Sequence, residues 1–158
     1  RILPADTVYF RDKVPVGKEE RKDWASKALQ QVAGCDVVFL DPDNGRWVKS
    51  VSSEAAKKAP KYVFKDELQG LMNTPGKSII IYQHVSRSGT AGKQIDSRKQ
   101  ELKALGGRSV YGLHYRRGTA RVFFVIPAAL HKEQLSPERS EQVLAAWMGS
   151  GRKHFELV

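Results

Sequence analysis

Two carboxylates and a histidine are the residues of this sequence best suited to chemistry. Asp41 and Asp43 come directly after the apolar run Val37–Leu40, and His84 ends a second apolar run. A carboxylate accepts a hydrogen bond from an amine, and an imidazole takes up a proton near neutral pH. Ligands of open α/β sheets bind outside the carboxyl ends of the strands. The sequence therefore predicts one catalytic site built from both strand ends.

The residues around the two aspartates form a turn. Pro42 has no N–H donor and a fixed φ, so a strand over Val37–Leu40, expected to be buried on both faces, has to end there. Asn44 and Gly45 both tolerate a positive φ. We expect Pro42, Asn44 and Gly45 to shape the turn and to contact a substrate.

The second strand end adds further binding residues. Tyr82 and His84 are two positions apart, so both side chains lie on one face of a strand. Arg87 and Lys93 follow in a segment that contains glycine and serine and leads into a basic helix. A helix start together with cationic side chains favours phosphate binding. We expect Tyr82 to contact the substrate, and Arg87 and Lys93 to hold phosphates.

The same carboxylates also fit a metal-dependent reaction. Asp41 and Asp43 have the spacing of the first motif of haloacid-dehalogenase phosphatases, although Gly45 replaces the residue that motif requires. With His84 they could bind a divalent metal in a nuclease or phosphoesterase. This alternative stays open at the level of the sequence.

The charge balance favours a polyanionic partner. The 158 residues include 27 Lys and Arg against 17 Asp and Glu, which gives a formal charge of +10. Nucleic acid, either DNA or RNA, is the usual partner of such a protein. A nucleic-acid-binding module without catalysis is therefore a third possibility. No apolar run is long enough to span a membrane, so no membrane partner is expected.

Apolar patterns predict alternating strands and helices. Strands are expected over residues 7–10, 37–40, 78–84, 109–116, 120–127 and 154–158, and helices over 18–32, 52–58, 64–71, 93–105 and from 136 onward. This order predicts a single α/β domain over residues 1–158, a Rossmann-like three-layer sandwich. Its sheet is expected to be mostly parallel and to end in an antiparallel hairpin. The single cysteine, Cys35, favours a reducing, cytoplasmic location.

Parallel strand–helix units that close in an antiparallel hairpin resemble the carboxyl half of a class I S-adenosylmethionine-dependent methyltransferase. In the amino-methyltransferase branch one strand ends in Asp-Pro-Pro-Tyr, and Asp41-Pro42-Asp43-Asn44 keeps the first two residues. The resemblance implies transfer of a methyl group to nucleic acid, with S-adenosylmethionine as cofactor and Asp41 accepting a hydrogen bond from the substrate amine.

This sequence departs from that family at two points. Asn44 replaces the aromatic residue that stacks on the target base, and no Gly-x-Gly-x-x-Gly loop follows any strand. The cofactor-binding half is then absent or lies before Arg1, in a longer Rossmann-like domain. The chain is also similar to uncharacterised bacterial and phage proteins that carry Asp-Pro-Asp-Asn-Gly and Tyr-x-His-x-x-Arg, here Asp41 to Gly45 and Tyr82, His84 and Arg87. That second resemblance implies no function.

Overall fold

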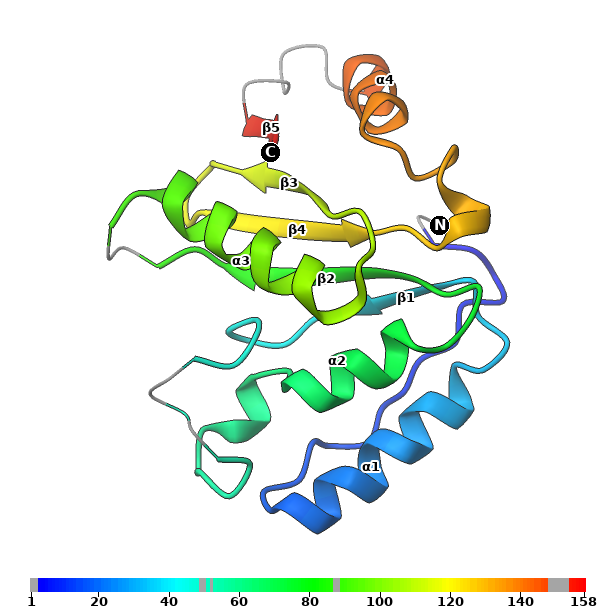
Figure 1. Cartoon of the computed structure of the whole chain (residues 1–158), viewed down its shortest axis with the longest axis vertical. Coiled ribbons are helices and arrows are strands. Elements are labelled where there is room, and N and C mark those ends of the chain that lie inside the picture. The colour runs from blue at the N-terminus through cyan, green and yellow to red at the C-terminus, as the bar shows by residue number, and fades with distance from the viewer. Residues whose placement is uncertain (1–2, 49–50, 52, 87–88, 148–153) are drawn as a thin grey trace.

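A single mixed sheet forms the centre of the protein (Figure 1). The computed structural model describes residues 3–48, 51, 53–86, 89–147 and 154–158. The described strands are β1 (Val37–Leu40), β2 (Ser78–His84), β3 (Tyr111–Tyr115), β4 (Arg121–Ile126) and β5 (Phe155–Leu157), and they lie side by side in the order β1-β2-β4-β3-β5.

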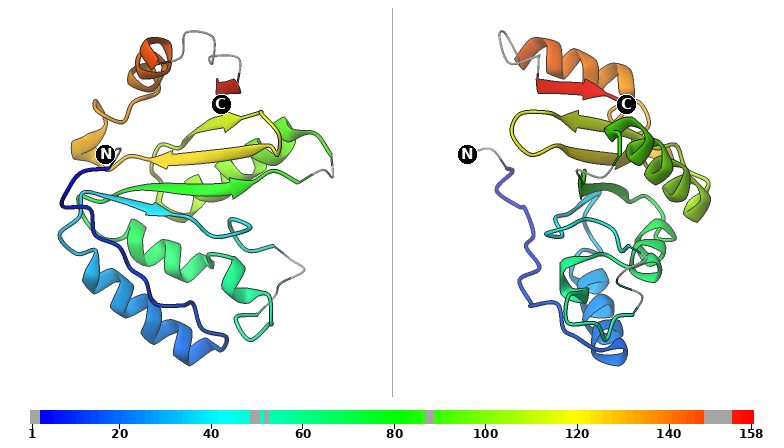
Figure 2. Two further views of the ribbon diagram at one scale, coloured as in Figure 1. Left: turned by 180° about the vertical axis from the view of Figure 1, so that it is seen from behind. Right: turned by 90° about the vertical axis from the view of Figure 1, so that its left-hand side faces the viewer.

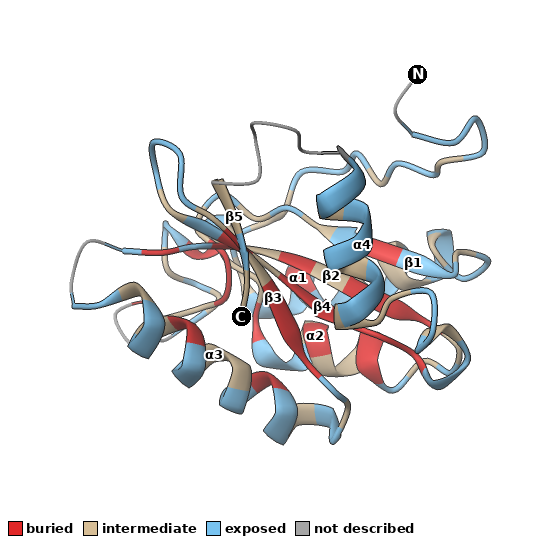
Figure 3. Ribbon diagram, turned by 90° about the horizontal axis from the view of Figure 1, so that it is seen from above, coloured by how far each residue is buried: buried red, intermediate tan, exposed pale blue. Residues whose placement is uncertain are grey.

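Four α-helices and two short 3-10 helices surround the sheet in the described part of the chain. They are α1 (Lys18–Gln31), η1 (Ala59–Lys61), α2 (Lys65–Met72), α3 (Ala91–Gly106), η2 (Ala129–His131) and α4 (Pro137–Trp147). Figure 2 shows α2 and α3 on one face of the sheet, with α1 beside α2. Viewed from above in Figure 3, α3 and α4 lie on opposite sides of the sheet.

The chain is α/β, but the expectation of a mostly parallel sheet is wrong. Among the described strands β1 and β2 are the parallel pair, and α2 forms the crossover between them. β4 pairs antiparallel with both β2 and β3, and β5 pairs antiparallel with β3. The predicted hairpin does form. Its second strand, however, inserts between β2 and β3, so each of its neighbours runs the other way.

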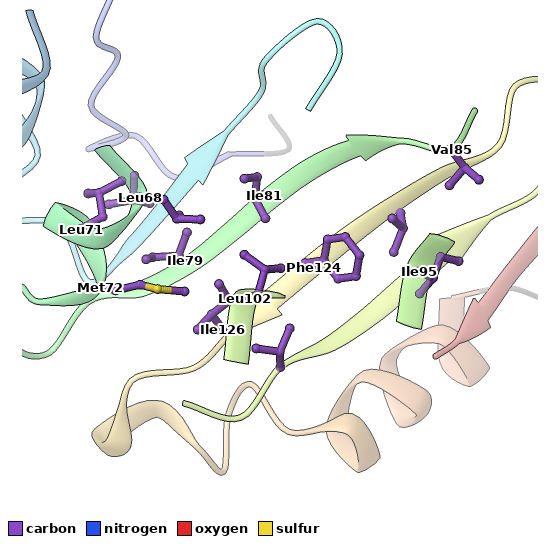
Figure 4. Packing of buried hydrophobic residues seen from close by; sticks show 13 residues of the cluster. Leu68, Leu71, Met72, Ile79, Ile81, Val85, Ile95, Leu102, Phe124 and Ile126 are labelled. Carbon is purple, nitrogen blue, oxygen red and sulfur yellow. The ribbon is translucent and has the colours of Figure 1, made fainter. Parts of the chain in front are cut away.

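The hydrophobic core lies between the sheet and the helices α2 and α3. Every second residue of the strands points into it, including Ile79, Ile81 and Phe124, none of which exposes any surface (Figure 4). Leu68 of α2 and Leu102 of α3 cover these residues from the helix side. This alternation places the neighbouring strand residues on the opposite face of the sheet.

Three expectations about local structure are corrected. Residues 7–10 form no strand; the segment lies along α1, where Gln31 Nε2 donates to the Tyr9 carbonyl over 3.0 Å. Of the helix expected over 52–58, residue 52 lies outside the described residues and 54–58 form turns and a bend, after which η1 follows. β1 is not buried on both faces, because the face that carries Val37 and Phe39 is open to solvent, with these residues 43% and 53% exposed.

Candidate functional site

The polar ends of β1 and β2 lie at one edge of the sheet, as predicted. The two strands are parallel neighbours, and Leu40 is the register partner of Ile81. Asp41 therefore leaves β1 next to the last residues of β2, which end at His84. The side chains of Asp41 and His84 are both exposed at this edge.

Short backbone hydrogen bonds close the turn after β1. The Gly45 N–H donates to the Pro42 carbonyl over 3.2 Å, and the Asn44 N–H donates to the Lys61 carbonyl over 3.0 Å. The exposed carboxylate of Asp43 lies 3.4 Å from Lys61 Nζ. Asp43 thus forms an exposed ion pair, whereas no ion pair forms to Asp41 among the described residues.

Gln83 joins the turn to the sheet. Its Oε1 accepts a hydrogen bond from the Arg46 N–H over 2.9 Å, and its Nε2 donates to the carbonyls of Asn44 and His84 over 3.2 and 3.1 Å. Gln83 is buried, and its bond to the Arg46 N–H is buried as well, so this bond satisfies a donor that water does not reach. The turn is consequently held to the end of β2 by one amide side chain.

Arg46 connects the same turn to α3. Its side chain is buried, and Nη1 lies 3.0 Å from Oε2 of Glu101, which also accepts a hydrogen bond from Arg98 Nη1 over 2.8 Å. Burial lowers the pKa of the Arg46 guanidinium despite the nearby Glu101 charge. Arg46 Nε has no hydrogen-bond partner among the described residues.

Glu101 sits between two cations as a result. Burial alone would raise the pKa of the Glu101 carboxyl, but the hydrogen bond and charge of Arg98 and the charge of Arg46 together lower it. Glu101 is therefore ionised at neutral pH and ties Arg46 to Arg98.

A cleft of about 990 Å³ opens beside this network. It lies between α3, the end of β2 and the segments around residues 44–48 and 62–65. Its cationic lining residues are Arg46, Lys65, Lys93 and Arg98, and its aromatic ones include Trp47 and Tyr62. Buried Arg21 fixes one wall, because its guanidinium donates to the carbonyls of Ala59 and Tyr62 and pairs with Glu67.

The predicted site residues divide between two places. Asn44, His84 and Lys93 line the cleft, whereas Asp41, Pro42, Asp43 and Gly45 do not. Tyr82 lies on the opposite face of the sheet, where its ring centroid is 5.7 Å from that of Phe123 and 6.4 Å from that of His84. His84, at the end of β2, therefore borders both the cleft and that opposite face. Arg87 lies outside the described residues. The structure thus brings together the turn and the two strand ends, but it does not gather all the predicted side chains around one cavity.

Two observations bear on the cofactors that the sequence predicts. Nowhere in the ranges that the structure describes do three His, Cys, Asp or Glu side chains gather closely enough to hold a metal ion. The N–H groups of Asn44, Gly45 and Arg46 all donate to protein acceptors, so the turn after β1 offers none of them to S-adenosylmethionine. We therefore derive no step through a cofactor.

Sequence reasoning missed the residues that hold this region together. Gln83 did carry a signal. Every second residue from Ile79 to Val85 is apolar except Gln83, so a polar side chain stands at a position expected to face the core. Its partners lie 37 and 39 positions away, however, and only the fold reveals them. The same is true of Arg46 and Glu101, which are 55 positions apart in the sequence.

Comparisons with protein-family models, with curated proteins and with solved structures found no match. Among the described residues no helix is long and apolar enough to cross a membrane. The function of this protein therefore has to be inferred from its own residues and from how the fold arranges them.

Proposed function

We propose that this protein binds nucleic acid and that the cleft beside α3 holds part of the phosphate backbone. The observation that carries the proposal is the cationic lining of the cleft by residues from separate elements. Lys65 and Lys93 are exposed and, within the described ranges, neither pairs with a carboxylate. Both ammonium groups are available to phosphate oxygens, which are the main protein contacts in nucleic-acid complexes.

Two further features support this proposal. The formal charge of +10 draws any polyanion toward the surface and speeds the encounter. The rings of Trp47 and Tyr62 line the same cleft as Lys65 and Lys93. Aromatic rings next to cationic side chains are the combination on which nucleic-acid bases stack.

Methyl transfer to nucleic acid is the second candidate. What favours it is a parallel crossover, β1–α2–β2, closed by the hairpin β3–β4, with Asp41-Pro42 directly after β1. Exposed Asp41 would accept a hydrogen bond from a substrate amine. Calorimetric titration with S-adenosylmethionine tests this candidate. Binding supports methyl transfer, and a failure to bind shows that this chain does not use S-adenosylmethionine. The metal-dependent nuclease has no comparable ligand set among the described residues.

The proposal is tested by binding of a fluorescently labelled single-stranded oligonucleotide to charge-neutralised variants. We expect Lys65→Gln and Lys93→Gln to weaken binding to every sequence tested, because each removes a phosphate contact. Lys132→Gln is the matched control. This exposed lysine follows η2 at the amino end of β2, the edge of the sheet away from the cleft. Equal affinities for all three variants and the unmodified protein would contradict the proposal.

A further inference from the structure

The face of the sheet opposite α2 and α3 carries large apolar side chains that the described part of the chain leaves open. Val37 and Phe39 of β1 are 43% and 53% exposed, and Ile80, Tyr82 and Phe123 beside them are partly exposed. An antiparallel sheet face that meets water normally presents polar residues. A contiguous exposed apolar patch of this kind indicates an interaction surface for a ligand or a macromolecule.

The aromatic rings of this face form a connected row across three strands. The centroid of the Phe123 ring is 6.4 Å from that of Phe39 and 5.7 Å from that of Tyr82. The imidazole of His84 is 6.4 Å from the Tyr82 ring. α4 reaches the same face farther along β3, where Tyr111 Oη and Ser140 Oγ are 2.9 Å apart. Phe39, Tyr82 and Phe123 remain at least partly exposed on this face.

Cationic residues border these rings. Arg121 is exposed in β4, and its register partners are His84 in β2 and Tyr115 in β3. Arg116 and Arg117 precede it in the hairpin and both are exposed, although Arg116 pairs with Glu156 of β5 over 3.3 Å. Rings flanked by arginines are complementary to a strand that alternates bases with phosphates.

We infer that this face, defined by Phe39, Tyr82, Phe123, His84 and Arg121, is a stacking surface for single-stranded nucleic acid. The inference rests on the proposed function and names its substrate class. Bases must be unpaired to lie on the rings, so the surface distinguishes a single strand from a duplex. Arg121 meets the phosphates between stacked bases. The cleft contributes phosphate contacts on the other side of β2.

Binding of matched single-stranded and duplex oligonucleotides to Phe39→Ala and Phe123→Ala tests the inference. Loss of one stacked base is expected to weaken single-strand binding by about 5- to 150-fold. The salt dependence stays unchanged, because no cation is removed. Leu130→Ala is the control, since this leucine is 63% exposed after β4 and lies off the ring surface. A cross-linking experiment with an iodouracil-substituted strand gives a second readout, with adducts expected on peptides that contain Phe39, Tyr82 or Phe123.

The outcomes separate the two proposals. If the unmodified protein binds with a steep salt dependence but the phenylalanine variants bind equally well, the stacking surface is wrong and the proposed function stands. If the unmodified protein binds no nucleic acid, both fail. Equal affinity for single strand and duplex, or a dimer that Phe39→Ala dissociates without loss of affinity, also overturns the inference.

Discussion

Gly45 lies so close to Gln83 that a Cβ atom on the glycine would be 2.5 Å from the Gln83 amide carbon and nitrogen. Gly45 also has φ 92°, a conformation that residues with a side chain rarely adopt. The turn that carries Asp41 and Asp43 is therefore packed directly against β2. Its glycine has a structural role, whatever its carboxylates bind.

Gly45→Ala is expected to destabilise the fold through both strain and overlap. The positive φ alone costs roughly 1–2 kcal/mol in a residue with a Cβ, and the overlap with Gln83 adds about 1–3 kcal/mol. Gly118→Ala is the matched control, because Gly118 has φ 76° and a Cβ atom there would meet nothing within 4 Å. Urea unfolding of the two variants measures the difference, and equal losses would show that contact with Gln83 is unimportant.

Gln83→Ala is expected to loosen the turn. The Arg46 N–H would lose its acceptor in a buried position, which typically costs about 1–3 kcal/mol. Gln100→Ala, on the exposed surface of α3, should change the free energy of unfolding by less than about 0.5 kcal/mol. Chemical denaturation measures the free energy of unfolding of both variants. Equal values for the two would show that the hydrogen bonds of Gln83 do not stabilise the fold.

Glu101→Gln is expected to change how stability depends on pH. The pKa of Glu101 is lowered in the folded protein, so its ionised form stabilises the fold above the ordinary glutamate pKa of about 4.3. That contribution is lost as the pH falls from there through the lowered pKa. Unfolding curves at about pH 7, 4 and 2.5 should show the unmodified protein losing its advantage over the variant at the acid end. A constant difference at all three values would argue against the Arg46–Glu101–Arg98 network.

Asp41→Ala and His84→Ala are expected to leave the melting temperature close to its original value. Both side chains are exposed, and changes at such positions usually alter stability by less than about 0.5 kcal/mol. Binding of the labelled oligonucleotide should weaken in His84→Ala, because His84 borders the cleft and the aromatic face. It should not weaken in Asp41→Ala, because that change removes a negative charge and Asp41 does not line the cleft. Unfolding of both variants with binding per folded molecule intact would show that their role is structural.

The local elements could be predicted from the sequence where apolar period and turn residues agree. The strand Ser78–His84 and the helix Lys65–Met72 follow such patterns. Residues 7–10 have strand composition but lie along α1, where Phe10 packs 5.4 Å from Trp24 between ring centroids. Composition alone therefore does not decide whether a segment becomes a strand. The segment also needs a neighbouring strand to pair with, and residues 7–10 pack against a helix instead.

The sheet order could not be predicted for a related reason. The short segment Arg117-Gly118-Thr119 between two apolar runs predicts the hairpin β3–β4. Such a turn does not specify which of the two strands pairs with β2. Burial decides this: Val122, Phe124 and Ile126 of β4 are almost fully buried, which suits the centre of the sheet. The sequence does predict that Asp41 and His84 lie at the same edge of the sheet. Two neighbouring parallel strands joined by a helix must end at one edge, whatever the order of the remaining strands.

The salt dependence of nucleic-acid affinity tests the central claim most directly. The association constant for a short single-stranded oligonucleotide is measured over a series of salt concentrations with the unmodified protein and with a Lys65→Gln/Lys93→Gln double variant. Counterion release predicts a linear fall of log K with log salt, with a slope of about −0.7 for each phosphate contacted. We expect a steep slope for the unmodified protein and one shallower by about 1.4 for the double variant. A flat response of the unmodified protein, or identical slopes for both proteins, would contradict the claim that the cleft binds phosphates.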